Sequence, residues 1–492
     1  MMQLGSNFLQ WSSPKISYQS TSAMADLIVF APDLTAPDRL LLRTLKDDMV
    51  RQSECAGAAL EAADEKKPGS VGASNGSAGG SRHRKAENGG MAHGTPDPSV
   101  LDADARDLAT LKAWNDPEKD AFEPTVFVSA DLSTLKLGPV LDKYVLQPYV
   151  RWGRKVARKQ TDVVMVTHLI LYFTTSVPSA LYLFWNFSYL HGFLHFAMQG
   201  YYVGTYTLMM HQHIHMRGIL APRFWLIDRL FPYITDPLMG HTWNTYFYHH
   251  VKHHHVEGNG PDDLSSTLRY QRDSLPDFLC YLGRFYFLVW LELPLYFLAK
   301  RRLAIAAKTA FWELSSYATY VALAKMVSWR ATLFVFILPL LVLRVGLMVG
   351  NWGQHAFVDP DEPDSDFRSS ITLIDVASNR YCFNDGYHTS HHLNPLRHWR
   401  DHPAAFLAQK GTYAREGALV FHDIDYLMIT VRLLMRDYDH LARRLVPIGG
   451  EQVRMSLAER AALLRRAARR FSEEEIARKF KTAAAAAGSG SR

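Results

Sequence analysis

The chain contains little cysteine. Only three of its 492 residues are cysteines, and Cys55, Cys280 and Cys382 are too far apart to form a CxxC pair. We therefore expect neither a disulfide scaffold nor a zinc site built from thiolates. The first residues also lack a long apolar run, so we expect no cleaved secretory signal. A hydrophobic content of 48% excludes a wholly disordered chain.

Two polar flanks enclose an apolar middle. Residues 1–124 form an N-terminal extension, in which a serine-rich start without acidic residues leaves a transit peptide open. Residues 26–63 can hold a short helix, and the Gly/Ser-rich residues 68–100 are typical of a disordered linker. We expect a membrane domain over residues 125–410. Residues 411–492 then form a C-terminal cytosolic helical region with a disordered tail, including a solvated or membrane-surface helix that Ser456 and Glu459 cap.

Two long segments of the middle carry no charged side chain. Residues 163–185 and 187–210 contain no Asp, Glu, Lys or Arg, and each is long enough as a helix to cross a hydrocarbon layer of ~30 Å. The short link between them predicts a tight hairpin. Five basic residues lie before the first segment and indicate that this flank is cytoplasmic; they are Arg151, Arg154, Lys155, Arg158 and Lys159.

Three further apolar stretches follow, at about 278–299, 309–327 and 331–350. The first contains Arg284, Glu292 and Pro294 and precedes a basic triplet, which favours an interfacial or re-entrant helix on the cytoplasmic side. The other two predict a second hairpin that turns near residues 328–330. The predicted fold is therefore all-α and polytopic. Four transmembrane helices form two hairpins, and a cytosolic helical cap carries the histidines.

Histidine is concentrated in two parts of the chain. Fifteen of the 22 histidines lie in residues 211–255 and 355–402. His211 and His215 are four residues apart and share one face of a helix, from which His213 points away. A second cluster follows at residues 249–255. It can be read as HxxHH from His250, or as HxxxHH from His249.

A third cluster has the HxxHH pattern of His388, His391 and His392, and the isolated His355 follows the last apolar stretch. Neutral imidazole is a suitable ligand for iron, zinc, copper and nickel. One tetrahedral zinc needs only about three or four protein ligands. The nine candidates are therefore too many for one metal ion and enough for two.

The order HxxxH, HxxHH, HxxHH around two membrane hairpins resembles the integral-membrane fatty acid desaturases and their hydroxylase relatives. The likeness covers roughly residues 160–405 and includes the segment NDGYHTSHHLNPLRHW. It implies an Asn-x-x-x-His pair in Asn351 and His355, with Asn351 making a water-mediated contact to the metal site. The third box starts with His388 and not with Gln, and no HPGG motif occurs, so the resemblance points away from enzymes fused to cytochrome b5. The metal ligands that it implies are His211, His215, His250, His253, His254, His355, His388, His391 and His392.

The resemblance implies a membrane enzyme that introduces a double bond into a fatty acyl chain. It would use O2 as co-substrate, external electrons and two iron ions held by these histidines. The expected partners are a fatty acyl lipid or acyl-CoA as substrate and cytochrome b5 or ferredoxin as electron donor, with no nucleic acid. The expected location is the endoplasmic reticulum, with a plastid membrane as the alternative.

Other functions stay open from the sequence. The same metal site could insert oxygen in a lipid hydroxylase or monooxygenase. A zinc-dependent membrane hydrolase or receptor would need fewer ligands, and in a non-enzymatic scaffold the histidines would be surface groups. Asp385 could hold an imidazole by its second nitrogen, or it could be a turn residue in Asn384-Asp385-Gly386.

Overall fold

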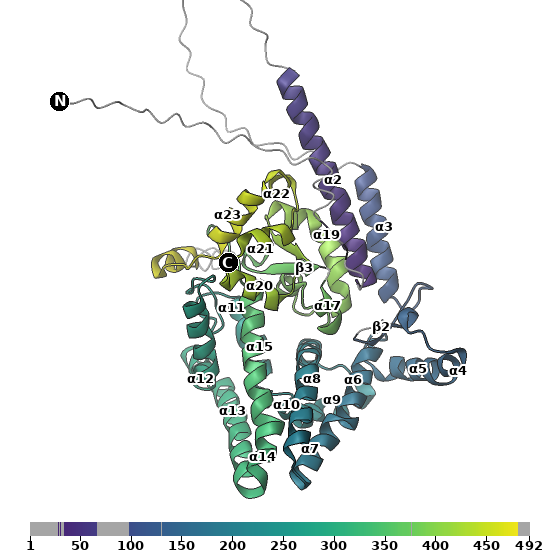
Figure 1. The fold of residues 1–492 in the computed structure, drawn as a ribbon, viewed down its shortest axis with the longest axis vertical. Helices are drawn as coiled ribbons and strands as arrows, with labels where there is room; N and C mark the ends of the chain where they lie inside the picture. The colour runs from purple at the N-terminus through teal and green to yellow at the C-terminus, as the bar shows by residue number, and fades with distance from the viewer. Residues whose placement is uncertain are drawn as a thin grey trace, which may run out of the picture.

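The computed structural model describes residues 28, 30, 34–65, 98–128, 130–374 and 376–480. The serine-rich start, most of the predicted linker at 68–100 and the predicted C-terminal tail lie outside the described residues. The described chain is mostly helical, as the sequence predicts. Figure 1 shows long helices at one end of the molecule and a cap of shorter helices at the other end.

The first predicted hairpin is present. Its first arm consists of α6 (Val163–Thr174) and α7 (Ser176–Trp185), and its second arm is α8 (Tyr189–Met216). Ser179 Oγ lies 2.9 Å from His195 Nδ1, Ser176 Oγ donates a hydrogen bond of 2.8 Å to Gln199, and the rings of Tyr172 and Tyr202 are 5.2 Å apart. Because these pairs are spaced about evenly around residue 187, the two arms are antiparallel.

A second hairpin turns at Ser328, where the sequence predicts a turn. Its arms are α13 (Leu303–Leu323) and α15 (Leu338–Gln354), and η5 (Ala324–Ser328), α14 (Trp329–Thr332) and η6 (Leu333–Ile337) lie between them. Ser328 is extended, with φ −158 and ψ 111. The rings of Tyr320 and Phe336 stack 5.2 Å apart, and Glu313 pairs with Arg344 at 2.5 Å. These contacts join residues about equally far before and after Ser328, so the two arms are antiparallel.

Three helical stretches of the described residues are long and apolar enough to cross a membrane, which indicates a membrane-associated protein. They are Val163–Trp185, Leu275–Ala299 and Leu303–Gln354. The last stretch contains both arms of the second hairpin. The predicted crossing at 187–210, nearly all of which lies in α8, is not among them, since histidines, a glutamine and glycines interrupt its apolar residues.

The helix α12 (Leu275–Ala299) has contacts with the same loop near both of its ends. Near its start, the hydroxyl of Tyr281 donates to the carbonyl of Ser265. Near its end, the ring of Tyr296 packs 4.2 Å from that of His253, and Lys300 pairs with Asp262 at 2.8 Å. Both ends of α12 therefore lie beside residues 253–265, at the base of the cap.

The cap contains a small sheet that the all-α prediction did not include. Strand β4 (Leu419–His422) lies between β3 (Ile371–Ile374), to which it is parallel, and β5 (Leu445–Val446), to which it is antiparallel. All four residues of β3 are buried, so helices cover both of its faces. The short helices of the cap are α16 (Asp366–Ser369), α17 (Ala377–Tyr381), α18 (His388–Leu393), α19 (His402–Arg415), α20 (Tyr426–Leu434), α21 (Tyr438–Arg444) and α22 (Gly450–Arg454).

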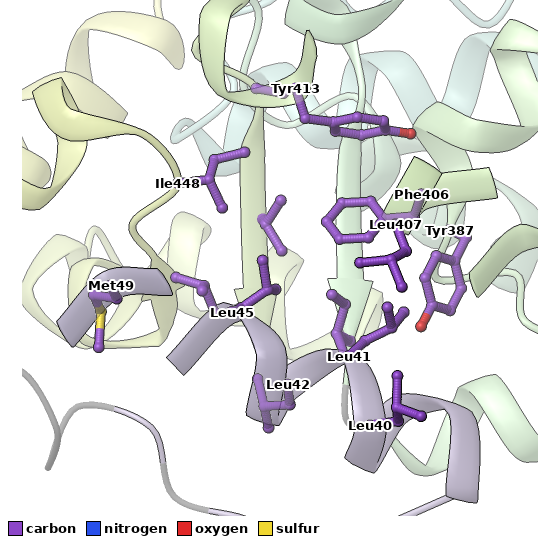
Figure 2. Packing of buried hydrophobic residues seen from close by; sticks show 14 of the residues in the cluster. Leu40, Leu41, Leu42, Leu45, Met49, Tyr387, Phe406, Leu407, Tyr413 and Ile448 are labelled. Atoms are coloured by element: carbon purple, nitrogen blue, oxygen red, sulfur yellow. The ribbon is translucent and has the colours of Figure 1, made fainter. Parts of the chain in front are cut away.

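Two N-terminal helices pack on the cap. They are α2 (Ala36–Glu65), where the sequence predicts a short helix, and α3 (Pro98–Asn115). Figure 2 shows the leucines of α2 against Phe406 and Tyr387 of the cap. At the start of α2, the buried Asp38 accepts a hydrogen bond of 2.5 Å from the hydroxyl of Tyr387, next to His388. The N-terminal extension therefore supports the segment that carries the third histidine box.

Short elements join α3 to the first hairpin. They are β1 (Thr125–Phe127), β2 (Ala130–Asp131), η1 (Leu132–Thr134), α4 (Pro139–Leu141), η2 (Asp142–Leu146) and α5 (Gln147–Val156). The buried Asp162, just before α6, accepts hydrogen bonds from His398 at 2.7 Å and from Trp399 at 3.1 Å. These bonds hold the start of the first hairpin against the chain that follows the third histidine box.

The C-terminal helix differs from its prediction. α23 (Leu457–Ala467) begins with the predicted capping box of Ser456 and Glu459. One face of the helix packs in the core of the cap, where Leu464 is fully buried, and its other face is exposed. The helix ends at Ala467, and residues 473–480 form a separate helical segment.

Candidate metal centre

The first histidine box lies at the end of α8. His211 and His215 are one helical turn apart, and their ring centroids are 4.7 Å apart. His213 points away, as predicted from its position on the helix, and its Nε2 lies 3.0 Å from the carbonyl oxygen of Asp228. The helix ends at Arg217, which has the left-handed conformation with φ 57.

The second box lies on a π-helix, η4 (Phe247–His254), which continues into α11 (His255–Glu257). The backbone N–H of His255 donates to the carbonyl of His250, five residues earlier. This wider turn places residues four and five apart on the same face. His250, His254 and His255 therefore point to one side.

His253 points elsewhere. The HxxHH reading from His250 includes His253 as a ligand, whereas the structure places His255 beside the other rings. The buried His253 Nε2 accepts a hydrogen bond of 2.9 Å from the backbone N–H of Leu264. The HxxHH reading assumes the period of an α-helix. This segment is a π-helix, whose wider turn points His253 away from the other rings and His255 toward them. His249, the other surplus residue, packs its ring against Phe285.

The third box lies on α18, and His355 is the C-cap of α15. Because α8 and α15 are the second arms of the two hairpins, both deliver their histidines to the same end of the bundle. The structure thus gathers nine histidines into two groups, within each of which the ligand nitrogens lie within 4.8 Å of one another. The five-histidine group contains His211, His215, His250, His255 and His391. The four-histidine group contains His254, His355, His388 and His392.

The geometry of both groups suits a metal ion. His211 Nε2 lies 2.8 Å from His250 Nε2, and His391 Nε2 lies 2.7 Å from His255 Nε2. In the other group, His388 Nε2 is 3.2 Å from His355 Nε2. Metal–imidazole bonds of ~2.0–2.1 Å place two ligand nitrogens of one ion roughly 3 Å apart. Each group therefore has the spacing that one shared ion requires.

The protonation state of the rings also suits a metal ion. Burial, followed by the charges of neighbouring imidazoles, lowers the pKa of His250, His388 and His391 well below the ordinary value of 6.5. Neutral imidazoles keep a free nitrogen lone pair, which is the form that binds metal. Facing lone pairs repel one another, so a cation between them would stabilise the arrangement.

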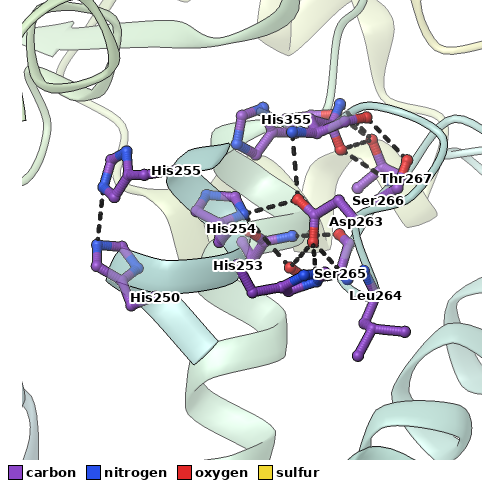
Figure 3. A network of polar contacts seen from close by, with 12 residues as sticks. His250, His253, His254, His255, Asp263, Leu264, Ser265, Ser266, Thr267 and His355 are labelled. Carbon is purple, nitrogen blue, oxygen red and sulfur yellow. Dashed lines mark hydrogen bonds and ion pairs between the residues drawn. The ribbon is translucent and has the colours of Figure 1, made fainter. Parts of the chain in front are cut away.

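Hydrogen bonds orient several of these rings. Figure 3 shows Asp263, whose Oδ2 lies 2.7 Å from His254 Nδ1. Burial alone would raise the pKa of Asp263. The charge of His254 and its hydrogen bond to the carboxylate hold that pKa well below its ordinary value of 3.8. His355 Nδ1 donates to the carbonyl of Ser369 at 2.7 Å. In both rings Nε2 is left to face the group.

Asp263 was not identified from the sequence. For Asp385, one expectation was a hydrogen bond to the second nitrogen of an imidazole, and the structure shows a different partner. The only sequence signal for Asp263 is an acidic residue nine positions after His254. Asp385 accepts a hydrogen bond of 3.0 Å from Gln354 and not from an imidazole. Burial raises the pKa of Asp385 to about 7. Asn351 donates to the hydroxyl of Tyr281 at 2.7 Å and borders the cavity described next.

A cavity of about 260 Å³ connects the two groups with the helical bundle. Next to the histidine groups, the cavity is lined by two rings of each group: His211 and His250 of the first, and His254 and His388 of the second. The rest of the cavity is mainly apolar and lies between α8 and α15, where glycines leave room. These glycines are Gly204, Gly346 and Gly350. An extended apolar chain could therefore lie between the helices with one part next to both groups.

Comparison with known proteins identifies the family. The family model described as Fatty acid desaturase matches residues 188–423, which contain both histidine groups and the cavity. No curated protein and no solved structure matches the chain. Through residues 188–423, the chain belongs to the fatty acid desaturase family.

Proposed function

We propose that the protein is a membrane lipid desaturase that introduces a double bond into a fatty acyl chain. The observation that carries this proposal is the pair of histidine groups at the head of one apolar cavity. Family membership makes the chain an oxidoreductase of the desaturase and hydroxylase type. The cavity adds a space suited to an alkyl chain.

The chemistry requires a metal. A methylene C–H bond has no acidic proton, so side-chain acids and bases cannot remove its hydrogens. Two bound iron ions, with O2 and electrons from a donor protein, would supply the oxidising power. Histidines of the two groups would hold the ions, and buried partners such as Asp263 and the carbonyl of Ser369 would keep their rings oriented.

The protein itself positions the substrate and excludes water. The apolar wall between α8 and α15 favours an alkyl chain over water. Holding one carbon–carbon bond next to the histidine groups makes removal of its hydrogens effectively unimolecular. Because the cavity borders both groups, the same site can present two adjacent carbons.

The proposed topology has four crossings, formed by the arms of the two hairpins. The antiparallel contacts within each hairpin and the histidines at one end of both second arms support it. We assign α12 to the membrane surface on the cap side, because residues near both of its ends contact residues 253–265. In this topology the cap would face the cytosol, where cytochrome b5 or, in a plastid, ferredoxin could reach it.

Lipid analysis tests this function. The full chain is expressed in a yeast that lacks its own desaturases, and lipids are analysed by mass spectrometry. We expect acyl chains that have lost two hydrogens and purified protein that contains two irons. H391A and H392A should abolish the product, whereas H440A, outside both groups, should not. Gain of one oxygen would indicate a hydroxylase, zinc in place of iron would indicate a hydrolase or receptor, and unchanged lipids would contradict the proposal.

A further inference from the structure

A helical segment just before the first hairpin packs on that hairpin along one face. It consists of α4, η2 and α5, residues 139–156, and we call it the entry helix. Figure 1 shows α4 and α5 extending to the side of the helical bundle. The buried side chains of Leu146 and Val150 pack against Val163, the first residue of α6. Gly153 permits this close approach, because a Cβ there would lie 2.8 Å from a methyl group of Val163.

The entry helix also carries a row of exposed apolar side chains. The row repeats at intervals of four residues, which share one face of a helix; its members are Val140, Tyr144, Pro148 and Trp152. Val140 and Tyr144 are exposed by 68% and 66%, and Trp152 by 48%. Exposed apolar surface of this extent indicates contact with a membrane or with another protein.

A row of cations runs beside the apolar row. Lys143, Arg151 and Lys155 are spaced by four or eight residues, and Lys159 continues the spacing just beyond the end of the helix. All four side chains are exposed, and none forms an ion pair with a carboxylate within the part of the chain that the structure describes. An apolar row next to a row of unneutralised cations is typical of a helix that lies on a membrane surface.

Two contacts place the entry helix at the cap-side end of the first hairpin. The backbone N–H of Ala221, which follows α8, donates to the carbonyl of Val156 at 2.8 Å. The hydroxyl of Tyr149 lies 2.6 Å from that of Thr167, near the start of α6. Because α6 begins the stretch Val163–Trp185, which is long and apolar enough to cross a membrane, the entry helix lies beside the end of a candidate span.

We propose that the entry helix lies along the membrane surface on the cap side and binds anionic phospholipids. The proposal rests on the proposed topology, in which the first hairpin crosses the membrane. The apolar row then enters the boundary of the acyl chains, and the basic row meets the negatively charged head groups. Tyrosine and tryptophan are enriched at this depth, because each ring joins an apolar body to a polar edge. A soluble acidic protein would match the basic row but would not explain the apolar row beside it.

Lipid binding by the full chain tests the basic row. The chain in detergent is titrated with phosphatidylserine or phosphatidylcholine of identical acyl chains, and native mass spectrometry follows the lipids that are retained. We expect wild type to prefer phosphatidylserine. R151Q/K155Q/K159Q should bind phosphatidylserine about 10-fold or more weakly, from the loss of charge attraction, and should bind phosphatidylcholine as wild type does.

The control R443Q/R454Q/R466Q removes the same charge from exposed arginines of the cap and should keep the wild-type preference. Since all six side chains are exposed, the unfolding temperature of both variants should equal that of wild type, which separates lost binding from lost folding. The proposal is overturned if wild type binds both lipids equally, if R151Q/K155Q/K159Q keeps the preference, or if the control loses it to the same extent.

Spin labelling tests the position of the apolar row. A nitroxide is attached at Y144C in a chain whose exposed cysteines are replaced by C55S and C280S, and the chain is placed in nanodiscs that contain phosphatidylserine. The same chain without Y144C corrects for residual label. Oxygen concentrates in the bilayer, whereas a water-soluble nickel complex stays outside it.

We expect oxygen to relax the label at Y144C more than nickel does, and nickel to relax a label at R454C, on the cap, more than oxygen does. Relaxation at Y144C that equals relaxation at R454C would overturn the proposal. Neither test needs bound metal or turnover. A chain that passes both tests but leaves the lipids of the yeast unchanged would retain the lipid-binding helix and reject the proposed desaturase activity.

Discussion

His254 and Asp263 form a hydrogen bond of 2.7 Å between Nδ1 and Oδ2 at the edge of the four-histidine group. The carboxylate is fully buried and also accepts from the backbone N–H of Ser265 at 2.8 Å, so its own position is fixed. A proton held on Nδ1 leaves the Nε2 lone pair of His254 directed at His355 and His392. Asp263 thus decides which nitrogen of His254 can bind a metal.

Replacing Asp263 should weaken metal binding. We expect D263A to lower the affinity for iron by roughly 10–100-fold, the usual cost of removing a partner that orients a ligand. Iron retained after dialysis against graded chelator measures the change. The control is D262A, which removes the adjacent, exposed carboxylate that pairs with Lys300. Equal iron retention in D263A and D262A would contradict the assigned role.

The choice between His253 and His255 can be tested by paired substitutions. H255Q should lower the iron content, because His255 Nε2 lies 2.7 Å from His391 Nε2 within the five-histidine group. H253Q should retain iron, since the amide oxygen of Gln can replace His253 Nε2 as acceptor for Leu264 N–H. Iron per chain and lipid products are measured for both. Loss of iron in H253Q with retention in H255Q would restore the HxxHH reading.

Filling the cavity should change activity without harming the fold. A Cβ added at Gly346 meets no atom within 4 Å, so G346L should extend into the cavity. We expect lower product yield or shorter acyl chains in the product. The unfolding temperature should be unchanged or higher, because replacing a helical glycine gains about 0.5–1 kcal/mol. G200L, on the exposed face of α8, is the control, and equal product profiles for both variants would contradict the prediction.

Acid should weaken the contact between Asp162 and His398. Burial alone would raise the pKa of Asp162, but the charge and hydrogen bond of His398 lower it below 3.8. The folded chain therefore binds this proton less tightly than the unfolded chain. Its stabilising contribution is present above pH 3.8 and is lost as the pH falls toward the lower folded pKa.

We expect D162N to remove this part of the acid dependence. Thermal unfolding in detergent, followed from about pH 6 to about pH 3, should show a shallower loss of stability in D162N than in wild type. D120N, which changes an exposed carboxylate, should follow wild type. Parallel curves for D162N and wild type would show that the contact contributes nothing to the pH dependence.

Local patterns predicted much of the architecture. The charge-free segments at 163–185 and 187–210 predicted the first hairpin, and the turn near residue 328 was predicted from the polar residues between two apolar runs. The α-helical period correctly predicted that His211 and His215 share one face of a helix, and that His388 and His392 share one face of another. Each of these features depends on residues close together in the chain.

Other features depend on contacts between distant segments. The π-helix that brings His255 to His391 has no simple signature in sequence, since it differs from an α-helix only by where each N–H finds its carbonyl. The position of Asp263 beside His254 depends on the loop that follows the second box. The cap sheet pairs β3 with β4 across 48 residues, from Ile371 to Leu419, so its strands are too short to predict alone.

By itself, the sequence determined the supply of imidazoles, the apolar helices that carry them and their placement at one end of two hairpins, because helical periodicity and hydropathy act locally. Only the tertiary structure decided how the rings divide into two groups. It also decided that Tyr387, beside the third box, donates a hydrogen bond to Asp38, and that Arg217 and Arg229 line one pocket. Those relationships join residues far apart in the chain, and packing of the whole fold is what brings them within contact distance.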